Sequence, residues 1–460
     1  MFEKRFTAIA KKWLSVWCGL AIAFGLVFVL LSGALAQEKE KVSTAPEELT
    51  DVQKVSFPAI PLRKPGEEET GDKEWFGTDL PWWEWSRMTG NWGGARKSME
   101  DAGVAIEGAA IFDVSRVASG GIRRRWIARS LLDFQAALDL KKLLNFELGT
   151  LAARYYSFFG RDASRDAGDI QAFDNLDANR QRHQLAELWY EQKFFNESLR
   201  LKVGKVDTNS EFAFTENGAE FNHSSMGFSP TLIGFSSYPD PAMSVNLFVY
   251  PTDDLYVGFG AYDGAAQRGY ETGPRGPGTF FRGLNKLMYV GELGGKWVVA
   301  QLPGRLALGG WYHNGTFDRF DGTRKSGTGG WYMVFDQMVW RPDGAKEEDK
   351  KGVGLFLQYG NAQPAVSEIQ HHVGGGFSWT GPIPDREEDV FGWGTTWSRL
   401  SSARGAGFAK KHELAIETFY KIKVTGWFSL KPDLQYIINP SGARGVKNAV
   451  VPTLRFEWQF

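Results

Sequence analysis

The chain has one cysteine in 460 residues, Cys18. No disulfide can therefore form within it, which excludes the small secreted folds that covalent cross-links hold together. Cys18 is also a poor lipid-attachment site, because most of the apolar run of residues 13–31 follows it instead of preceding it. A fold made by this sequence must be stabilised by the extent of its secondary structure.

Long hydrophobic runs are absent after residue 31, which excludes a helical membrane protein but not a barrel that crosses with alternating strands. The first twelve residues carry four Lys or Arg, and small residues at 34–36 follow the apolar run. This order predicts a secretory signal peptide over residues 1–36. The alternative is an uncleaved anchor, since residues 13–31 nearly reach the roughly 20 apolar residues that a spanning helix needs.

An excess of one charge sign is also missing, because 53 Lys and Arg balance 54 Asp and Glu along the chain. A nucleic-acid binder would show a basic patch or stripe, so we expect no nucleic-acid partner. Neither a G-x-S-x-G nor an H-E-x-x-H motif occurs. His371 and His372 are adjacent in an expected strand and would point to opposite faces, which disfavours a shared metal. We expect no cofactor and no enzyme, although a triad assembled from distant strands would escape this search.

Glycine and aromatic residues are abundant, and apolar residues alternate with polar ones in many short segments. In the last segment, Leu454, Phe456, Trp458 and Phe460 share one face, while the other face is polar. Similar alternation recurs around residues 132–140, 353–359 and 413–422, with polar faces too richly charged for a dry core. The pattern predicts an all-β fold, a transmembrane antiparallel β-barrel with its apolar faces toward lipid.

About sixteen candidate strands lie between residues 104 and 460, an even number as bacterial barrels require. Short connections are expected at 141–145, 195–198, 251–254 and 301–304, and long ones at 159–184, 207–243, 263–287 and 315–329. The connection at 341–351 is long for its position. Short periplasmic turns alternating with long extracellular loops fit this order. A sixteen-stranded barrel leaves an aqueous channel, which makes transport the natural function.

The residues before the barrel divide into three expected parts. Residues 1–36 form the signal peptide, 37–80 a flexible periplasmic lead-in rich in Glu, Lys, Pro and Thr, and 81–103 a Trp-rich segment. The Trp-rich segment could plug, cap or dock against the base of the barrel 104–460, with simple interfacial packing as the favoured reading. A plug would point to a structural or adhesive barrel.

Several motifs resemble the carbohydrate-selective porin family, the OprB-like, glucose-type outer-membrane channels. They are Thr-Gly-Asn-Trp-Gly-Gly-Ala-Arg at 89–96, Gly-Lys-Val-Asp-Thr-Asn at 204–209, Tyr-Pro-Asp-Pro-Ala at 238–242, and the stretch 417–440 with Leu-Lys-Pro-Asp-Leu-Gln-Tyr-Ile-Ile-Asn-Pro. The resemblance extends over nearly the whole chain from residue 85. It implies a sixteen-stranded barrel, arginine-rich constrictions and sugar selectivity.

Selectivity for neutral sugars needs hydrogen-bonding and aromatic side chains at the narrowest section. Strand parity and the basic run at 123–125 suggest the pore-lining candidates Arg124, Arg125, Arg129, Arg154, Glu187, Trp189 and Glu191. For any one of these residues the simpler interpretation is a charge on the wall that pairs with an opposite charge across the lumen. The run at 123–125 could fold inward and donate to hydroxyls, or point outward to lipid phosphates. The connection 207–243, with six polar residues including Glu211 and His223, is the best candidate to fold into the lumen.

We therefore expect a porin of the Gram-negative outer membrane that passes small sugars or similar solutes by passive diffusion. A general, non-selective porin is the alternative, followed by an outer-membrane barrel enzyme or a structural barrel. Expected partners besides solutes are outer-membrane lipid and the barrel-assembly machinery, which would contact the terminal Phe460. The protein is expected to be a monomer or a homotrimer.

Overall fold

The computed structural model describes residues 80–146, 149–176, 180–232, 234–265, 269–283, 286–342 and 351–460. The expected signal peptide, 1–36, and all of the expected lead-in except Leu80 lie outside the described residues. The described residues up to 250 and from 254 onward belong to one compact unit, which contains the barrel.

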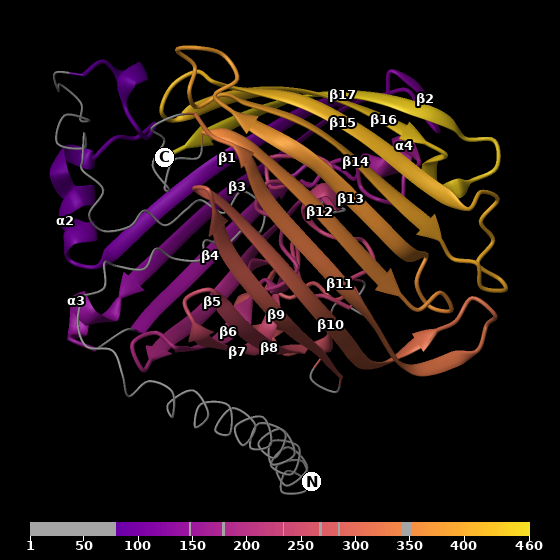
Figure 1. The fold of residues 1–460 in the computed structure, drawn as a ribbon, viewed down its shortest axis with the longest axis horizontal. Helices are drawn as coiled ribbons and strands as arrows, with labels where there is room; N and C mark the ends of the chain where they lie inside the picture. Colours follow the sequence, from indigo (N-terminus) through magenta and orange to yellow (C-terminus); the bar gives the residue numbers. More distant parts are fainter. Residues whose placement is uncertain are drawn as a thin grey trace, which may run out of the picture. The chain divides into compact units, whose positions relative to one another are not determined.

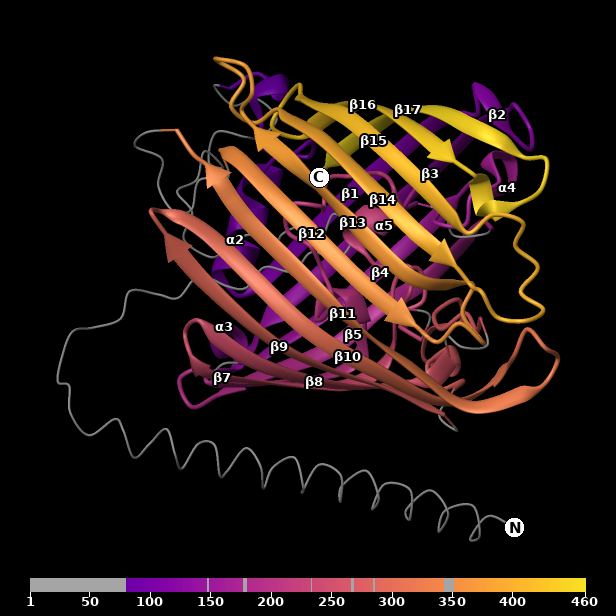
Figure 2. The same cartoon turned by 45° about the vertical axis from the view of Figure 1, so that its right-hand side comes forward.

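The strands form one antiparallel sheet that closes on itself (Figures 1 and 2). Strand β1 (Val104–Arg116) pairs on one side with β3 (Trp126–Asp139) and on the other with β17 (Lys447–Gln459), so the first and last strands close the ring. Sixteen strands in the described residues make up the wall, which confirms the expected number and fold class. The short β2 (Ser119–Gly121) pairs with β17 in the first outer connection.

The other wall strands follow in sequence order, each paired with the next. They are β4 (Gly149–Phe159), β5 (Arg182–Phe194), β6 (Leu199–Val206), β7 (Ala242–Thr252), β8 (Leu255–Asp263), β9 (Leu287–Val299), β10 (Leu302–Asp318), β11 (Arg324–Trp340), β12 (Gly352–Ala362), β13 (Ile369–Thr380), β14 (Val390–Leu400), β15 (His412–Lys423) and β16 (Phe428–Ile438).

Alternation along each strand separates a lipid-facing surface from the inner wall. In β3, Phe134 is 42% exposed on the outside, whereas its neighbour Asp133 is 3% exposed on the inside. In β13, His371 is partly exposed and His372 is fully buried, so the two rings lie on opposite faces as expected. The inner wall is therefore polar and charged, and the outer surface is apolar, as in other membrane barrels.

The connections alternate between short and long, as predicted, over the first half of the barrel. One expected long connection is wrong: residues 315–329 belong mostly to β10 and β11, and only 319–323 join them. Cross-strand pairing continues from Thr316 with Ser326 to Asp318 with Arg324. Gly327, at φ 77°, sits in a bulge that this pairing accommodates.

The described helices are short. They are α2 (Ala95–Asp101), α3 (Leu140–Leu144), α4 (Ser164–Ala167) and α5 (Ser224–Gly227), with 3₁₀ turns η2 (Trp82–Glu84), η3 (Trp92–Gly94), η4 (Thr208–Ser210), η6 (Gly276–Thr279) and η7 (Pro440–Gly442). Within the described part of the chain, none of the helices has the length and apolar character needed to cross a membrane.

The Trp-rich segment packs at the end of the barrel where both β1 begins and β17 ends. The Trp427 indole N–H donates to the carbonyl of Trp82 at 3.0 Å, and the two rings lie 4.3 Å apart. The backbone N–H of Met88 donates to the carbonyl of Gln459 at 2.8 Å. The segment thus lies against the β15–β16 turn and the last strand, and these contacts attach it to the barrel end.

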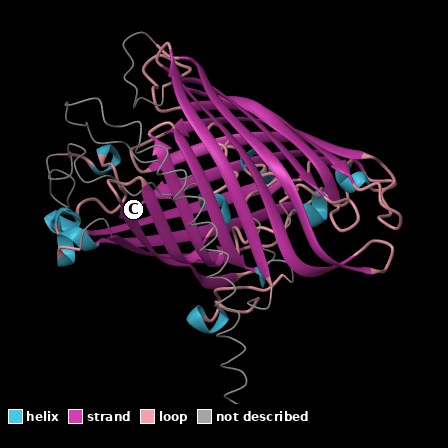
Figure 3. Cartoon of the chain, turned by 60° about the horizontal axis from the view of Figure 1, so that its bottom comes forward, coloured by secondary structure: helices cyan, strands magenta, loops and turns pink. Residues whose placement is uncertain are grey.

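Two outer connections turn back into the barrel instead of extending from it (Figure 3). We call them the lumen loops: loop A, residues 160–181, and loop B, residues 207–241. Phe173 of loop A is fully buried in an apolar cluster with Ile437 and Val451 of the wall. Phe212 and Phe235 of loop B are buried in a larger cluster on the inner faces of β5 and β7–β12. Apolar contacts therefore fix both loops to the wall.

Candidate channel lining and constriction

Loop B crosses the lumen from one side of the ring to the other. Glu211 near its start bonds to Lys202 of β6 at 2.6 Å, and Glu220 further along bonds to Lys421 of β15 at 3.0 Å. Strands β6 and β15 lie on opposite sides of the sixteen-strand ring. The prediction that this connection folds into the lumen is confirmed, and the channel is therefore narrower than the sheet alone would leave it.

Wall carboxylates hold loop B by accepting hydrogen bonds from its backbone. The contacts are Glu417 with the N–H groups of Asn222 (2.6 Å) and His223 (3.0 Å), Asp336 with those of Glu216 (3.0 Å) and Asn217 (2.9 Å), and Glu292 with that of Ala213 (2.9 Å). A loop inside a barrel has no neighbouring strand to satisfy its amides, so side chains must do so.

The acidic residues of loop B are matched by wall cations. Burial raises the pKa of Glu211, but Arg200 and Lys202 more than offset this, so the pKa lies below its usual value. The pKa of Glu220 is also below its usual value, because Lys421 and Lys431 more than offset the effect of burial. Both carboxylates are thus held in the ionised form, and their charges are neutralised locally.

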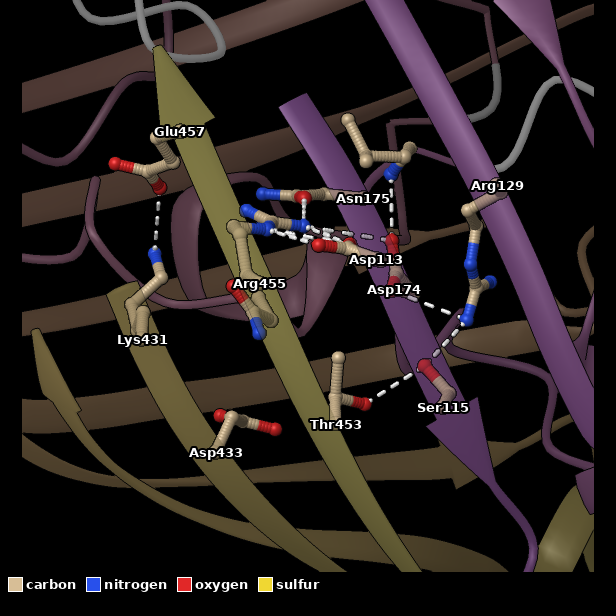
Figure 4. Close-up of polar contacts among 12 residues, drawn as sticks. Asp113, Ser115, Arg129, Asp174, Asn175, Lys431, Asp433, Thr453, Arg455 and Glu457 are labelled. Carbon is tan, nitrogen blue, oxygen red and sulfur yellow. Dashed lines mark hydrogen bonds and ion pairs between the residues drawn. The ribbon is translucent and has the colours of Figure 1, made fainter. Parts of the chain in front are cut away.

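Loop A is held by arginines of β3 and β17 (Figure 4). Asp174 forms ion pairs with Arg129 at 3.1 Å and with Arg455 at 3.5 Å. Arg455 also donates to Asp113 at 2.7 Å and to the Asn175 side chain at 2.7 Å. Arg455, Asp113 and Asp174 are at most 2% exposed, so this network fills the space between loop A and the wall.

Arg154 of β4 points inward, as its parity predicted, and joins neighbouring strands of the wall. Its Nε donates to Asp133 of β3 at 2.9 Å, and a terminal nitrogen donates to Glu187 of β5 at 3.4 Å. The plainer reading, a paired wall charge, describes these contacts, but the partners are adjacent in the wall and not across the lumen. Arg154 and Glu187 are 7% and 5% exposed.

Trp189 and Glu191 of β5 also face inward. The Lys202 ammonium lies 4.1 Å from the Trp189 ring centroid, and Glu191 pairs with Lys202 at 3.1 Å and with Arg200 at 3.2 Å. Arg200 and Glu191 keep 16% and 12% of their side chains exposed, more than Arg154 does. The structure therefore brings Arg154, Trp189, Glu191 and their cationic neighbours onto one sector of the inner wall, β4–β6.

Arg124 and Arg125 are not part of this sector. They lie between β2 and β3 in the first outer connection, with exposed side chains, and form no ion pair with any residue that the structure describes. Arg129, in contrast, points inward from β3 and is 3% exposed. A role for Arg124 and Arg125 in lining the pore stays a prediction.

Several inward residues were not predicted from the sequence. Arg305 of β10 donates to the carbonyl of Phe214 in loop B at 2.9 Å, and its guanidinium lies 3.9 Å from the Phe214 ring centroid. Glu413 of β15 accepts from the N–H groups of Ile170 and Gln171 in loop A. Parity places such residues on the inner face, but nothing in the sequence indicates which loop reaches them.

These features define the class of the protein. The barrel is closed, its outer surface is apolar, its inner wall is charged, and two loops fold into its lumen. This combination is that of an outer-membrane channel, a porin. The chain lies in the outer membrane, as expected, and small solutes cross it by passive diffusion.

The comparisons with known proteins identify the family. Residues 128–460 match the family described as carbohydrate-selective porin, OprB family. The chain belongs to this family, whose members are channels. Porin B of Pseudomonas aeruginosa is 23% identical over 430 residues, covering 81% of this chain and 91% of that protein.

Solved structures agree on the fold. The high-pH structure of Pseudomonas putida OprB superposes with a TM-score of 0.73 at 22% identity, covering 82% of this chain and 99% of that one. The low-pH structure of the same protein gives 0.54 at 19% identity, with the same coverage. The resemblance that the sequence motifs suggested is therefore confirmed.

Proposed function

We propose that the channel selects neutral carbohydrates, and that solutes contact the wall sector β4–β6 together with loop B. The observation that carries the proposal is the local pairing of charge: Arg154, Arg200 and Lys202 of this sector each have a carboxylate within ion-pair distance, as with Arg200 and Glu191 at 3.2 Å, whereas the buried Lys205 donates to the carbonyl of Ala186. Paired charges produce little net field, which favours neither cations nor anions, yet they present many donors and acceptors to hydroxyl groups.

Partly exposed members of these pairs are the groups a solute would reach. Besides Arg200 and Glu191, a second cluster joins Glu220 of loop B to Lys421 of β15 and Glu457 of β17, with side chains 38%, 18% and 15% exposed. Trp189 adds an aromatic face beside Lys202. Sugars present hydroxyls at their edges and apolar C–H surfaces on their faces, so this combination suits them better than it suits small ions. The name of the matched family, carbohydrate-selective porin, supports the same substrate class.

Single-channel recording in planar bilayers tests the proposal. The native protein should give a steady current that falls as a sugar is added. Current that ignores sugars would overturn selectivity in favour of a general porin. Liposome swelling with a panel of mono- and disaccharides then ranks the substrates. Arg154→Ala should change the ranking, while Arg124→Ala, whose side chain lies in the outer connection, tests whether that residue takes part.

The variants Arg200→Gln and Glu191→Gln test the effect of charge on selectivity without a large change in the size of the side chain. Each variant removes one charge from a partly exposed cluster with little change in side-chain volume, while Glu191 keeps its ion pair with Lys202 and Arg200 keeps its ion pair with Glu211. Loss of the Arg200 charge should shift the channel toward cation selectivity, and loss of the Glu191 charge toward anion selectivity. Their reversal potentials in a salt gradient should therefore move in opposite directions. Identical reversal potentials in both variants would contradict a solute path along this sector.

A further inference from the structure

Three outer segments carry many cations and no carboxylate. Residues 116–126, 399–412 and 439–448 contain ten Lys or Arg and no Asp or Glu. The cations are Arg116, Arg123, Arg124, Arg125, Arg399, Arg404, Lys410, Lys411, Arg444 and Lys447. Because the whole chain has nearly equal numbers of positive and negative residues, the excess of positive charge is specific to these segments.

The three segments form one surface, which we call the basic rim. The first segment contains β2, whose Gly121 pairs with Lys447 in β17. The second and third meet where the backbone N–H of Lys410 donates to the carbonyl of Gly442 at 2.9 Å. In Figure 1 the outer ends of β15–β17 and the short β2 accordingly lie together at one side of the barrel. The ten cations thus share one arc above β1, β3 and β14–β17.

Among the described residues these cations lack a paired carboxylate, although Asp166 of loop A lies beside the first segment, where its carbonyl accepts from the N–H of Arg123 at 3.0 Å. All ten residues are exposed, and none forms an ion pair with any of the residues that the structure describes. Another outer connection shows the usual arrangement, since Arg324 pairs with Asp318 at 3.1 Å and Arg319 with Asp321 at 3.9 Å. Ten like charges on one arc repel one another, so an anionic ligand would stabilise the rim.

The rim lies at the level of the lipid headgroups. Trp126 is 66% exposed, and the Arg116 guanidinium lies 5.2 Å from its ring centroid. On β14, the outward Trp397 is followed at the next outward position by the exposed Arg399. Exposed aromatic residues form girdles at the two membrane interfaces of such barrels. Cations just beyond this girdle, on outward strand positions, face the lipid and not the lumen.

We propose that the basic rim binds the phosphate groups of anionic lipid in the outer leaflet. Arg guanidinium groups match phosphate in a bidentate geometry, and clustered Lys and Arg at a membrane surface attract anionic headgroups. Arg399 and Arg116 reach the lipid from the strand ends, and the cations at 404, 410–411 and 444 reach over the headgroups from the loops. Loop residues Gly405, Gly407 and Gly445, at φ 91°, 78° and 81°, allow the tight turns that carry these side chains.

Lipid binding by the folded porin in nonionic detergent tests the proposal. The probe is a bisphosphorylated lipid A, with its dephosphorylated form for comparison, titrated by microscale thermophoresis. The rim variant is Arg399→Gln, Arg404→Gln, Lys410→Gln and Lys411→Gln. The control removes four exposed cations from other outer connections: Arg275→Gln, Arg282→Gln, Arg319→Gln and Arg324→Gln. Heat-modifiable migration and native conductance establish that each variant is folded.

The rim variant should bind the phosphorylated lipid about tenfold more weakly or worse, while the control stays within about twofold of the native affinity. A variant that keeps the charge, Arg399→Lys with Arg404→Lys, should retain most of the binding. Equal affinity for the dephosphorylated lipid, or an equal loss in the control, would overturn the proposal. So would a rim variant with native lipid affinity but a shifted reversal potential, because the rim would then serve dissolved anions.

Discussion

Arg154 shows how single residues set the character of the lumen. It bonds to Asp133 and Glu187 from two neighbouring strands, and all three side chains are nearly buried. Burying an ion is costly unless a partner is close, so these groups depend on one another. The inner wall can therefore carry many charges while its local field stays small.

Replacing this arginine should be costly. Arg154→Ala leaves two buried carboxylates without their cation and should lower the free energy of unfolding by about 3–5 kcal/mol. Arg165→Ala is the control: Arg165 is 71% exposed and pairs with Asp162 at 3.3 Å, so its loss should change stability by less than about 1 kcal/mol. Urea unfolding in detergent, followed by tryptophan fluorescence, measures both. Similar midpoints for the two variants would contradict a stabilising role of the buried pair.

His223 of loop B should make stability sensitive to acid. Burial lowers the pKa of His223 to about 3, and its Nδ1 accepts a hydrogen bond from the backbone N–H of Ser225 at 3.2 Å. The folded protein therefore holds the neutral ring, while the unfolded chain takes up a proton near pH 6.5. The stabilisation is fully present above pH 6.5 and is lost as the pH falls toward 3, by about 2 kcal/mol between pH 7 and pH 5.

His223→Asn tests this sign, because Asn keeps an oxygen that can cap Ser225 but does not titrate. The free energy of unfolding of the variant should fall less steeply between pH 7 and pH 5 than that of the native protein, with the two curves differing by about 2 kcal/mol at pH 5 relative to pH 7. Parallel curves would show that His223 is not held neutral in the folded state.

At the scale of elements, the lumen loops depend on a few wall carboxylates. Glu417 serves loop B and Glu413 serves loop A, four residues apart on the same face of β15. Each accepts backbone N–H groups that have no strand partner. Strand β15 thus contributes to the attachment of both loops, alongside Asp336 and Glu292 for loop B and Arg129 and Arg455 for loop A.

Removing one carboxylate should loosen its own loop more than the other, although the loops also touch where the Asn175 N–H donates to the Asn222 carbonyl at 2.8 Å. Glu417→Ala leaves two buried N–H groups unsatisfied and should reduce protection of loop B by about 2–4 kcal/mol, while Glu413→Ala should do the same for loop A. Hydrogen exchange followed by mass spectrometry, on peptides from each loop, reads both effects in each variant. If either substitution loosened both loops equally, independent attachment would be wrong.

At the scale of the whole molecule, the last residues of the chain close the barrel against its first strand, β1. The backbone of Phe460 exchanges two hydrogen bonds with Gly108 of β1, at 2.8 and 2.9 Å. A Cβ at Gly108 would lie 2.3 Å from the Phe460 ring, which also meets Phe134 at a centroid distance of 5.3 Å. Glycine at 108 thus gives the last side chain room against the first strand.

Recognition of Phe460 by the barrel-assembly machinery stays a prediction. The variant Phe460→Ala distinguishes this recognition from the role of Phe460 in closing the barrel. The variant keeps both backbone bonds and loses an aromatic contact worth about 0.5–1.5 kcal/mol, so the purified protein should still fold into vesicles. Folded barrel in cells should drop severalfold, as followed by heat-modifiable migration. Unimpaired assembly in cells would remove Phe460 as the recognised residue.

Strand parity made the fold and much of the wall predictable. The alternation around Asp133 and Phe134, the number of strands and the inward direction of Arg154 all follow from a side-chain period of two. The long connection expected at 315–329 was wrong, because a bulge lets β10 and β11 stay paired through most of this stretch. The contacts of Asp174 with Arg455 and of Glu413 with Gln171 could not be predicted, since the partners are 281 and 242 residues apart in the chain and meet only where the folded loop lies.

The sequence by itself determined that this chain makes a membrane barrel. The alternation of polar and apolar residues within each strand sets which face meets lipid and which faces the lumen, and it needs no distant partner. Only the tertiary structure decided how the lumen is filled, which charges are neutralised and where unpaired cations gather. Those outcomes depend on distances between segments that are remote in the chain, and on which backbone groups remain without a partner after the sheet has closed.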